Sequence, residues 1–163
     1  MDPDAIGRLL DRHEAPLTLF ARQLCDAPED VVQEAFLRLA DLDREPDDPG
    51  AWLYRVARNL ALDASRAAGR RRRHEARAAA ASPGWFDPAP IDGPEPAEAE
   101  AALRSLPVEE REVIVAHLWG GLTFERVGRA IGVSSSTAHR LYARGLQTLR
   151  ERMGASCPTR ETS

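Results

Sequence analysis

Several features that would point to other classes of protein are scarce in this chain of 163 residues. Aromatic residues make up only 6% of it, so leucine, valine, isoleucine and alanine must build the core, which favours small helical bundles over sheets. No apolar run approaches the roughly 20 residues that span a bilayer. The acidic N-terminus lacks the apolar core of a signal peptide. These absences predict a cytoplasmic protein without membrane insertion.

Residues that typically form metal sites or catalytic sites are also few. The two cysteines, Cys25 and Cys157, are far apart, and the four histidines form no cluster, so we expect neither a disulfide nor a metal site. No nucleophile–base pair and no phosphate-binding loop is present. The sequence therefore predicts no catalytic residue, no cofactor and no enzymatic activity.

Charge is unevenly distributed along the chain. Lysine is absent, and all 22 basic residues are arginines, which a GC-rich coding bias is sufficient to explain. The net charge is −8 over residues 1–50, +6 over 51–77, −5 over 78–103 and +3 over 104–163. Two basic segments separated by an acidic one indicate two separate contacts with nucleic acid.

Helical periodicity recurs three times in the first half of the chain. We expect a helix over residues 4–24, broken or restarted at Pro16, a second over 30–39 and a third over 51–68, which ends at Gly69. Apolar residues form a stripe on the third helix, where Trp52 is expected to be buried and Tyr54 to lie on the outer face with arginine and asparagine. Exposed aromatic and arginine side chains are typical of surfaces that bind single-stranded nucleic acid.

The second half contains the pattern of a helix-turn-helix. The stripe Val113, Ile114, His117 and Leu118 predicts one buried helix face, and Gly120-Gly121 is expected to end that helix. Thr123 and Ser134 are predicted to cap the next two helices, with a tight turn at Gly132 between them. The N-terminal part of the last helix is then expected to enter the major groove of DNA. His117 is interpreted as a core histidine rather than a ligand.

The predicted fold is all-α, with two small helical domains joined by a flexible linker. The domains cover residues 4–75 and 103–153, and an acidic linker rich in proline and alanine covers 76–102. Residues 154–163 are expected to form a disordered tail. Trp85-Phe86 in the linker has no assigned role.

Three segments in this order resemble the sigma factors of the extracytoplasmic-function class. They are DVVQEAFLRL from Asp30, AWLYRVARNLALD from Ala51, and LPVEEREVIVAHLWGGLTFERVGRAIGVSSSTAHRLYARGLQTLRE from Leu106. The resemblance covers about residues 8–75 and 103–153. It implies that the first domain is region 2, the second is region 4, and the partners are core RNA polymerase and promoter DNA. It leaves open whether an anti-sigma factor also binds.

The resemblance also implies which residues make these contacts. The polymerase-binding residues would be Asp30, Gln33, Glu34 and Leu37. The minus-10 residues would be Tyr54, Arg55, Arg58, Asn59, Asp63 and Arg66, beside a base-capturing loop at 43–50. The minus-35 residues would be Ser135, Ser136, Thr137, His139, Arg140 and Arg144. All of these positions are read from the sequence.

The recognition helix departs from the pattern of the family. His139 and Ala143 stand in a stretch where the family carries more cations, so we expect a different or weaker minus-35 preference. Gly145 costs roughly 1 kcal/mol relative to alanine in a helix interior, and close packing would explain it.

Three alternative functions remain open. The first is a helix-turn-helix repressor that binds an operator unaided, the second is an adaptor that binds only polymerase, and the third is an enzyme. The repressor would leave the first two segments unexplained.

Overall fold

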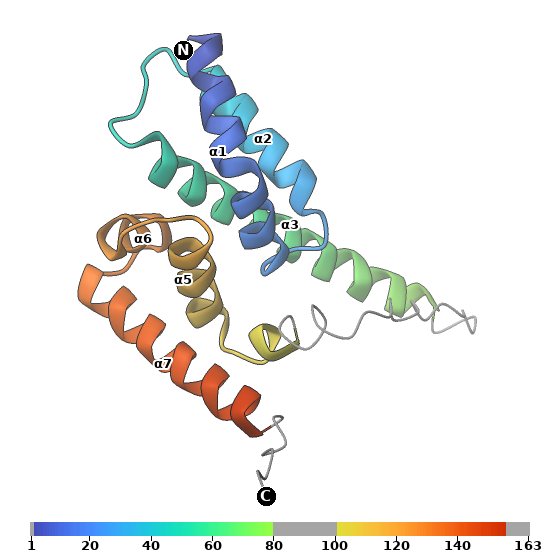
Figure 1. The fold of residues 1–163 in the computed structure, drawn as a ribbon. Coiled ribbons are helices and arrows are strands. Elements are labelled where there is room, and N and C mark those ends of the chain that lie inside the picture. The colour runs from blue at the N-terminus through green and yellow to red at the C-terminus, as the bar shows by residue number, and fades with distance from the viewer. Residues whose placement is uncertain (1, 80–100, 156–163) are drawn as a thin grey trace, which may run out of the picture.

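The computed structural model describes residues 2–79 and 101–155, which form helices joined by short loops and contain no strand (Figure 1). The first group of helices is α1 (Pro3–Arg22), α2 (Pro28–Ala40) and α3 (Pro49–Ala79). The second group is α5 (Val108–Leu118), α6 (Phe124–Ile131) and α7 (Ser135–Ala155), preceded by a helical turn at 101–104. This confirms the all-α prediction. Most of the predicted linker, including Trp85-Phe86, and nearly all of the predicted tail lie outside the described residues.

Helices α1 and α2 pack against each other and against α3. Leu17 and Phe20 of α1 and Leu39 of α2 are fully buried between them. The expected break at Pro16 does not occur, since this proline lies inside α1. A proline removes one backbone hydrogen bond from a helix, and burial of the following apolar side chains offsets that loss.

Helix α3 differs from the prediction in its length and in its buried face. It continues through Gly69 and the arginine cluster to Ala79, because one glycine costs a helix only about 1 kcal/mol and arginine is a good helix former. The most buried positions are Leu53, Tyr54, Ala57 and Ala61, whereas Trp52 is only half-buried. The buried stripe is therefore shifted by one residue from the predicted one, and Tyr54 belongs to it.

The second group of helices forms the predicted helix-turn-helix. The Thr123 hydroxyl accepts a hydrogen bond from the backbone of Arg126 at 3.4 Å, and Gly132 has the left-handed φ of 82° that a C-cap requires. The Ser134 hydroxyl accepts a hydrogen bond from the Thr137 amide at 3.1 Å and so caps α7. The prediction that Leu118 is buried is wrong: this residue, the last of α5, is 50% exposed.

The two groups of helices also pack on each other. Helix α3 contacts α6, and α1 contacts α5. Figure 1 shows α3 running between the α1–α2 pair and the helix-turn-helix, while its C-terminal half extends away from both. One continuous core of buried residues includes side chains of both groups. The two predicted domains therefore form a closed arrangement rather than separate bodies.

Candidate polymerase and nucleic-acid interfaces

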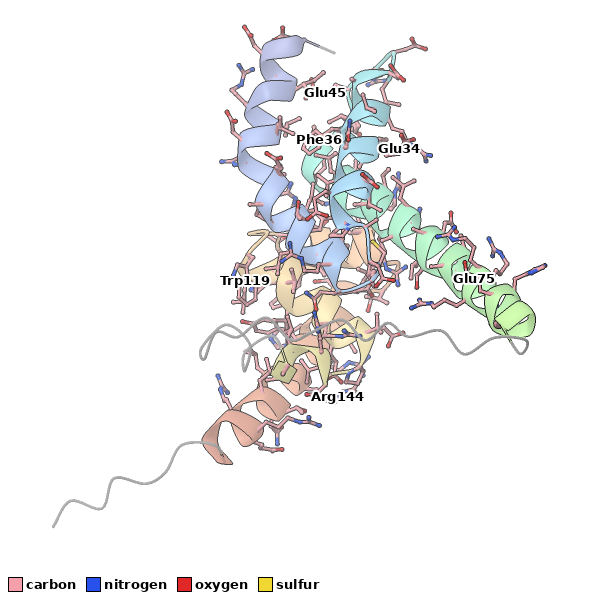
Figure 2. The ribbon with its side chains drawn as sticks, turned by 90° about the vertical axis from the view of Figure 1, so that its right-hand side faces the viewer. Glu34, Phe36, Glu45, Glu75, Trp119 and Arg144 are labelled. Atoms are coloured by element: carbon pink, nitrogen blue, oxygen red, sulfur yellow. The ribbon has the colours of Figure 1, made fainter. Side chains whose placement is uncertain are left out.

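The outer face of α2 carries the four predicted polymerase-binding residues. Asp30, Gln33 and Leu37 are exposed, and Glu34 is half-buried and accepts a 2.8 Å hydrogen bond from Arg38. Leu37 is 53% exposed, so its side chain is available to a partner. The opposite face of the helix is buried in the core, as Phe36 in Figure 2 illustrates. The exposed face of α2 is therefore held in place by packing of the opposite face against the core.

The structure separates the six predicted minus-10 residues into two sets. Arg55, Asn59, Asp63 and Arg66 are exposed on α3, and the last two form a 3.3 Å ion pair. Tyr54 and Arg58 instead face the helix-turn-helix. The surface that is free to contact DNA in this arrangement is therefore smaller than predicted.

Tyr54 corrects the expectation of an exposed base-stacking ring. Its ring is fully buried, with its centroid 5.1 Å from that of Phe20 in an edge-to-face contact. Its hydroxyl lies so close to Gly120 that a Cβ atom there would be 2.3 Å from Tyr54 Oη. The hydroxyl has no hydrogen-bond partner within the described part of the protein, and burial raises the pKa of Tyr54.

Arg58 is held by a carboxylate of the other domain. Its Nε donates to Glu112 Oε1 at 2.7 Å and its Nη2 to Glu112 Oε2 at 3.3 Å. The Glu112 side chain is completely buried. Burial raises the pKa of Glu112, although the hydrogen bond from Arg58 and its positive charge act in the opposite direction. Glu112 is therefore the carboxylate of an ion pair between the two domains.

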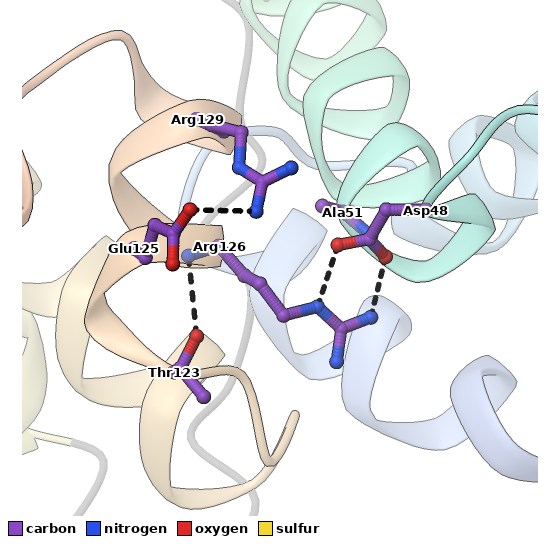
Figure 3. A network of polar contacts seen from close by, with 6 residues as sticks. All are labelled: Asp48, Ala51, Thr123, Glu125, Arg126 and Arg129. Atoms are coloured by element: carbon purple, nitrogen blue, oxygen red, sulfur yellow. Dashed lines mark hydrogen bonds and ion pairs between the residues drawn. The ribbon is translucent and has the colours of Figure 1, made fainter.

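Asp48, in the loop before α3 that was predicted to capture a base, links this loop to α6. Its carboxylate accepts a hydrogen bond from the Ala51 amide at 3.0 Å, at the start of α3. It also accepts two hydrogen bonds from Arg126, from Nε at 2.7 Å and from Nη2 at 2.5 Å (Figure 3). The hydrogen bond from Arg126 is the main reason that the pKa of Asp48 is lowered. A bidentate arginine–carboxylate pair fixes geometry as well as charge.

A cavity of about 240 Å³ lies where this loop meets α3 and α6. Its lining includes Asp48, Trp52 and Arg55. Arg129 of α6 also lines it, with a 3.1 Å hydrogen bond to Glu125 (Figure 3). The helix-turn-helix therefore forms one wall of the candidate minus-10 pocket.

The C-terminal half of α3 is a basic rod. Arg66 and Arg70–Arg73 are exposed, and Arg72 is 3.7 Å from Asp26 in a loose, exposed ion pair. Such a pair contributes little to stability, so phosphates can replace it. The rod is suited to following a nucleic-acid backbone.

The outer face of α7 carries five of the six predicted minus-35 residues. Ser135, Ser136, His139, Arg140 and Arg144 are exposed, and Thr137 is half-buried. Arg140 donates to the Thr137 hydroxyl at 3.1 Å. Arg144 donates to Glu110 at 2.5 Å, so an acidic group restrains it. A shallow cavity of about 230 Å³ is lined by Thr137, Arg140, Leu141 and Arg144.

An aromatic cluster supports this recognition helix from beneath. The His117 ring stacks on Phe124 with the centroids 4.2 Å apart, and His117 Nδ1 is 2.7 Å from the Leu122 carbonyl oxygen. Its interpretation as a satisfied core histidine is thus confirmed. The His139 ring meets Phe124 edge-on at 5.0 Å. His139 is therefore fixed on one side while its other side faces solvent.

Gly145 has the packing role proposed for it. A Cβ atom at this position would lie 2.7 Å from Ile114 Cδ1 and 3.2 Å from Glu110 Cβ. Glycine therefore allows α5 and α7 to approach closely.

Among the described residues, no group of histidine, cysteine and acidic side chains is arranged to hold a metal ion. The helices that the structure describes include none long and apolar enough to cross a membrane.

The exposed α2 face, the basic α3 and the helix-turn-helix together define a two-part helical protein with surfaces suited to nucleic acid. The Sigma-70 region 2 model matches residues 9–71, and the Sigma-70 region 4 model matches 102–151. The chain belongs to the extracytoplasmic-function class of the sigma-70 family.

Two curated relatives illustrate the family membership. The ECF RNA polymerase sigma factor SigE of Mycolicibacterium smegmatis is 34% identical over 135 residues, which cover 76% of this chain and 50% of that protein. RNA polymerase sigma factor CarQ of Myxococcus xanthus is 30% identical over 158 residues, covering 93% of this chain and 90% of that protein. The chain spans about half the length of the first curated relatives it matches.

Two solved structures share the fold of the chain. The sigma factor RpoE in complex with the anti-sigma factor NepR from Bartonella quintana has a TM-score of 0.66 at 22% identity, covering 94% of this chain and 98% of that one. CnrH in complex with the cytosolic domain of CnrY has a TM-score of 0.62 at 24% identity, covering 96% of this chain and 92% of that one. At these identities the likeness concerns the fold alone.

The sequence reasoning missed the residues that join the two domains, namely Asp48, Glu112 and Arg126. Their partners are 54 and 78 residues away along the chain, so no local pattern could pair them. The one available signal was Glu112, an acidic residue directly before the apolar run Val113–Ala116. Its place beside a buried run indicates a buried charge that needs a partner.

Proposed function

We propose that this chain binds core RNA polymerase and directs it to promoters, where it contacts the minus-10 and minus-35 elements. It catalyses no covalent step of its own, because the polymerase performs RNA synthesis. Membership of the sigma-70 family supports the proposal. The observation that carries it is the presence of three exposed surfaces, on α2, α3 and α7, each backed by a buried face.

The α2 face is assigned to polymerase. Leu37 is the only leucine among the four residues, and its exposed side chain supplies apolar area to a partner. Asp30, Gln33 and Glu34 around it supply acceptors and charge that favour a basic partner surface. An apolar centre with a polar rim is the usual anatomy of a protein–protein interface.

The α3 surface is assigned to the melted minus-10 strand, through Arg55, Asn59, Asp63 and Arg66. Arg55 and Trp52 at the pocket can stack on or hydrogen-bond to a base flipped out of the duplex. Tyr54 and Arg58 can join this surface only when the helix-turn-helix moves away, since both are covered by it.

The first turns of α7 are assigned to the minus-35 duplex. Arg140 and His139 are placed to contact base edges in the major groove, and Ser135, Ser136 and Thr137 to hold phosphates near the helix N-terminus. Arg144 lies about one turn beyond Arg140 and is restrained by Glu110. His139 stands where the family carries more cations, so we expect this residue to distinguish the minus-35 preference of this protein.

In vitro transcription with core polymerase over a promoter library tests the proposal. The wild-type chain should give promoter-directed transcripts that define both elements. Leu37→Glu should lower transcription at least about tenfold, because it places a charge in a desolvated interface, and should leave duplex binding intact. Leu118→Glu is the matched control, since this leucine is 50% exposed but lies on α5. No transcripts with the wild-type chain, or full activity of Leu37→Glu, would contradict the proposal.

A further inference from the structure

A buried carboxylate lies beneath the recognition helix. The Glu110 side chain on α5 is only 3% exposed, and its Oε1 accepts a 2.5 Å hydrogen bond from Nε of Arg144 on α7. A buried charge requires a partner, and this guanidinium provides one. The Arg144 side chain is itself 66% exposed. The pair therefore anchors the inner part of the guanidinium and leaves its outer end towards solvent.

Gly145 makes room for this carboxylate. A Cβ atom at position 145 would lie 3.2 Å from Glu110 Cβ and 3.5 Å from Glu110 Oε2, besides overlapping Ile114. Glycine is unfavourable in a helix interior, but here it lets α5 and α7 approach until Glu110 reaches Arg144. The close approach of the two helices and the ion pair therefore belong to one arrangement, formed by Glu110, Arg144 and Gly145.

The pair occupies the part of the guanidinium that a base contact does not need. The hydrogen bond to Glu110 uses the Nε–H of Arg144, which leaves the N–H groups of its two Nη atoms for another partner. Two such groups side by side match the N7 and O6 acceptors of guanine in the major groove. Because the guanidinium is planar, an anchor at Nε restricts the direction in which the Nη groups point.

Arg140, about one turn earlier on α7, is held differently. Its Nη2 donates to the neutral Thr137 hydroxyl at 3.1 Å, so the contact takes one of the terminal groups. A hydrogen bond to a carboxylate is also stronger than one to a hydroxyl. Both arginines line the shallow cavity of about 230 Å³ on α7. Of the two, Arg144 has the firmer anchor and the more suitable end for a bidentate contact.

We propose that Glu110 is a positioning residue that makes Arg144 a reader of guanine in the minus-35 duplex rather than a phosphate contact. The inference rests on the proposed function of α7. Glu110 is buried and touches no DNA itself. Without this anchor, Arg144 can turn towards the phosphates, which carry no sequence information. Glu110 therefore raises the preference for one base pair and lowers the affinity for duplexes of any sequence.

The full chain with Glu110→Gln tests this role. Wild-type protein is mixed with short duplexes that carry a randomised segment, and the bound fraction is sequenced. Guanine should be preferred at one position by roughly 5- to 150-fold, the range of a good bidentate contact, and Arg144→Ala should abolish this preference. Glu110→Gln should lose most of it, while duplexes without that guanine bind as tightly as before or more tightly. The log–log salt dependence of binding should steepen by up to about one unit, because Arg144 gains a phosphate.

Three further variants complete the experiment. Glu151→Gln removes an exposed carboxylate of α7 that accepts a 3.0 Å hydrogen bond from Gln147, and should keep the wild-type preference. Arg144→Lys keeps the charge and gives Glu110 a cationic partner but lacks the planar fork, so it should lose the preference. This variant still tests Arg144 as the guanine reader if Glu110→Gln fails to fold, which circular dichroism checks. Adding Glu110→Gln to Arg144→Ala should change the preference no further.

The outcomes separate the inference from the proposed function. The inference is wrong if no guanine preference depends on Arg144, if Arg144→Lys keeps that preference, or if Glu110→Gln keeps it. A loss of affinity for all duplexes alike, with the preference unchanged, would show that Glu110 serves only stability and would also overturn the inference. If the preference depends on both residues, but the wild-type chain with core polymerase gives no promoter-directed transcripts, the positioning role stands and the proposed function fails.

Discussion

Replacing Tyr54 with phenylalanine removes one hydroxyl group from the closed interface and nothing else. That hydroxyl is buried against Gly120 and has no hydrogen-bond partner in the described part of the chain. The ring itself, packed on Phe20 and facing His13 at 6.3 Å, is retained. Most substitutions at fully buried positions destabilise a protein. Here we expect the substitution to stabilise the protein, because the hydroxyl that it removes is buried without a hydrogen bond.

The magnitude follows from the cost of an unsatisfied buried polar group, roughly 1–3 kcal/mol. Part of this gain is lost, since the small space left by the oxygen forfeits some dispersion contacts. A net increase of about 1 kcal/mol in the free energy of unfolding is expected for Tyr54→Phe. For a chain of this size that corresponds to a rise in Tm of roughly 2–4 °C.

Alkaline pH provides a second signature of the same hydroxyl. Burial raises the pKa of Tyr54 above its ordinary value of 10, so the unfolded chain releases this proton first as the pH rises. The stability of the wild-type protein should therefore fall as the pH rises above 10, and the Tyr54 component of that fall should be missing in Tyr54→Phe.

Urea unfolding followed by circular dichroism at pH 7.5 and pH 10.5 measures both effects. Tyr142→Phe is the control, since its ring is only half-buried, and a change within about 0.5 kcal/mol is expected there. A loss of more than about 0.5 kcal/mol in Tyr54→Phe at pH 7.5 would refute the reasoning, because it would mean that the hydroxyl makes a favourable interaction in the folded state.

Three further substitutions test other parts of the structure. Burial, and then nearby arginines including Arg126, lower the pKa of His13. The unfolded chain therefore binds the proton first, and stability should fall as the pH drops below 6.5 in the wild type but less in His13→Gln, as measured by urea unfolding. Gly145→Val should destabilise by about 2 kcal/mol in thermal unfolding, because its side chain would overlap Ile114. Ser134→Ala should cost about 1 kcal/mol through loss of the α7 cap and weaken duplex binding in an anisotropy titration.

Local signals were sufficient to predict the helix-turn-helix from the sequence. Thr123 and Ser134 are capping residues, Gly132 supplies the left-handed turn, and all three act within four residues of themselves. The apolar face of α2 follows likewise from the spacing of its residues. In each case the deciding interactions are between residues close together in the sequence, so a local sequence pattern is enough to predict them.

The positions at which the sequence-based predictions were wrong depend on tertiary contacts. Gly69 was expected to end α3, but the penalty of a single glycine is too small to stop a helix that continues into good helix formers. Tyr54 was expected to be exposed because α3 alone has two plausible apolar faces. Contact with Phe20 and Gly120 selects the one that contains Tyr54. The role of Leu37 stays a prediction, since its exposure alone does not identify the partner.

The contact between the two domains combines ion pairs with apolar packing. An interface that must stay closed is usually large and apolar, whereas contacts between domains that move are smaller and more polar. Here two arginine–carboxylate pairs, Arg126 with Asp48 and Arg58 with Glu112, lie beside apolar side chains of the shared core, among them Tyr54. Each charged group can exchange its partner for water, and the arginines can also exchange theirs for phosphate. Arg58, which pairs with Glu112 in this arrangement, would become available to DNA if the domains separated.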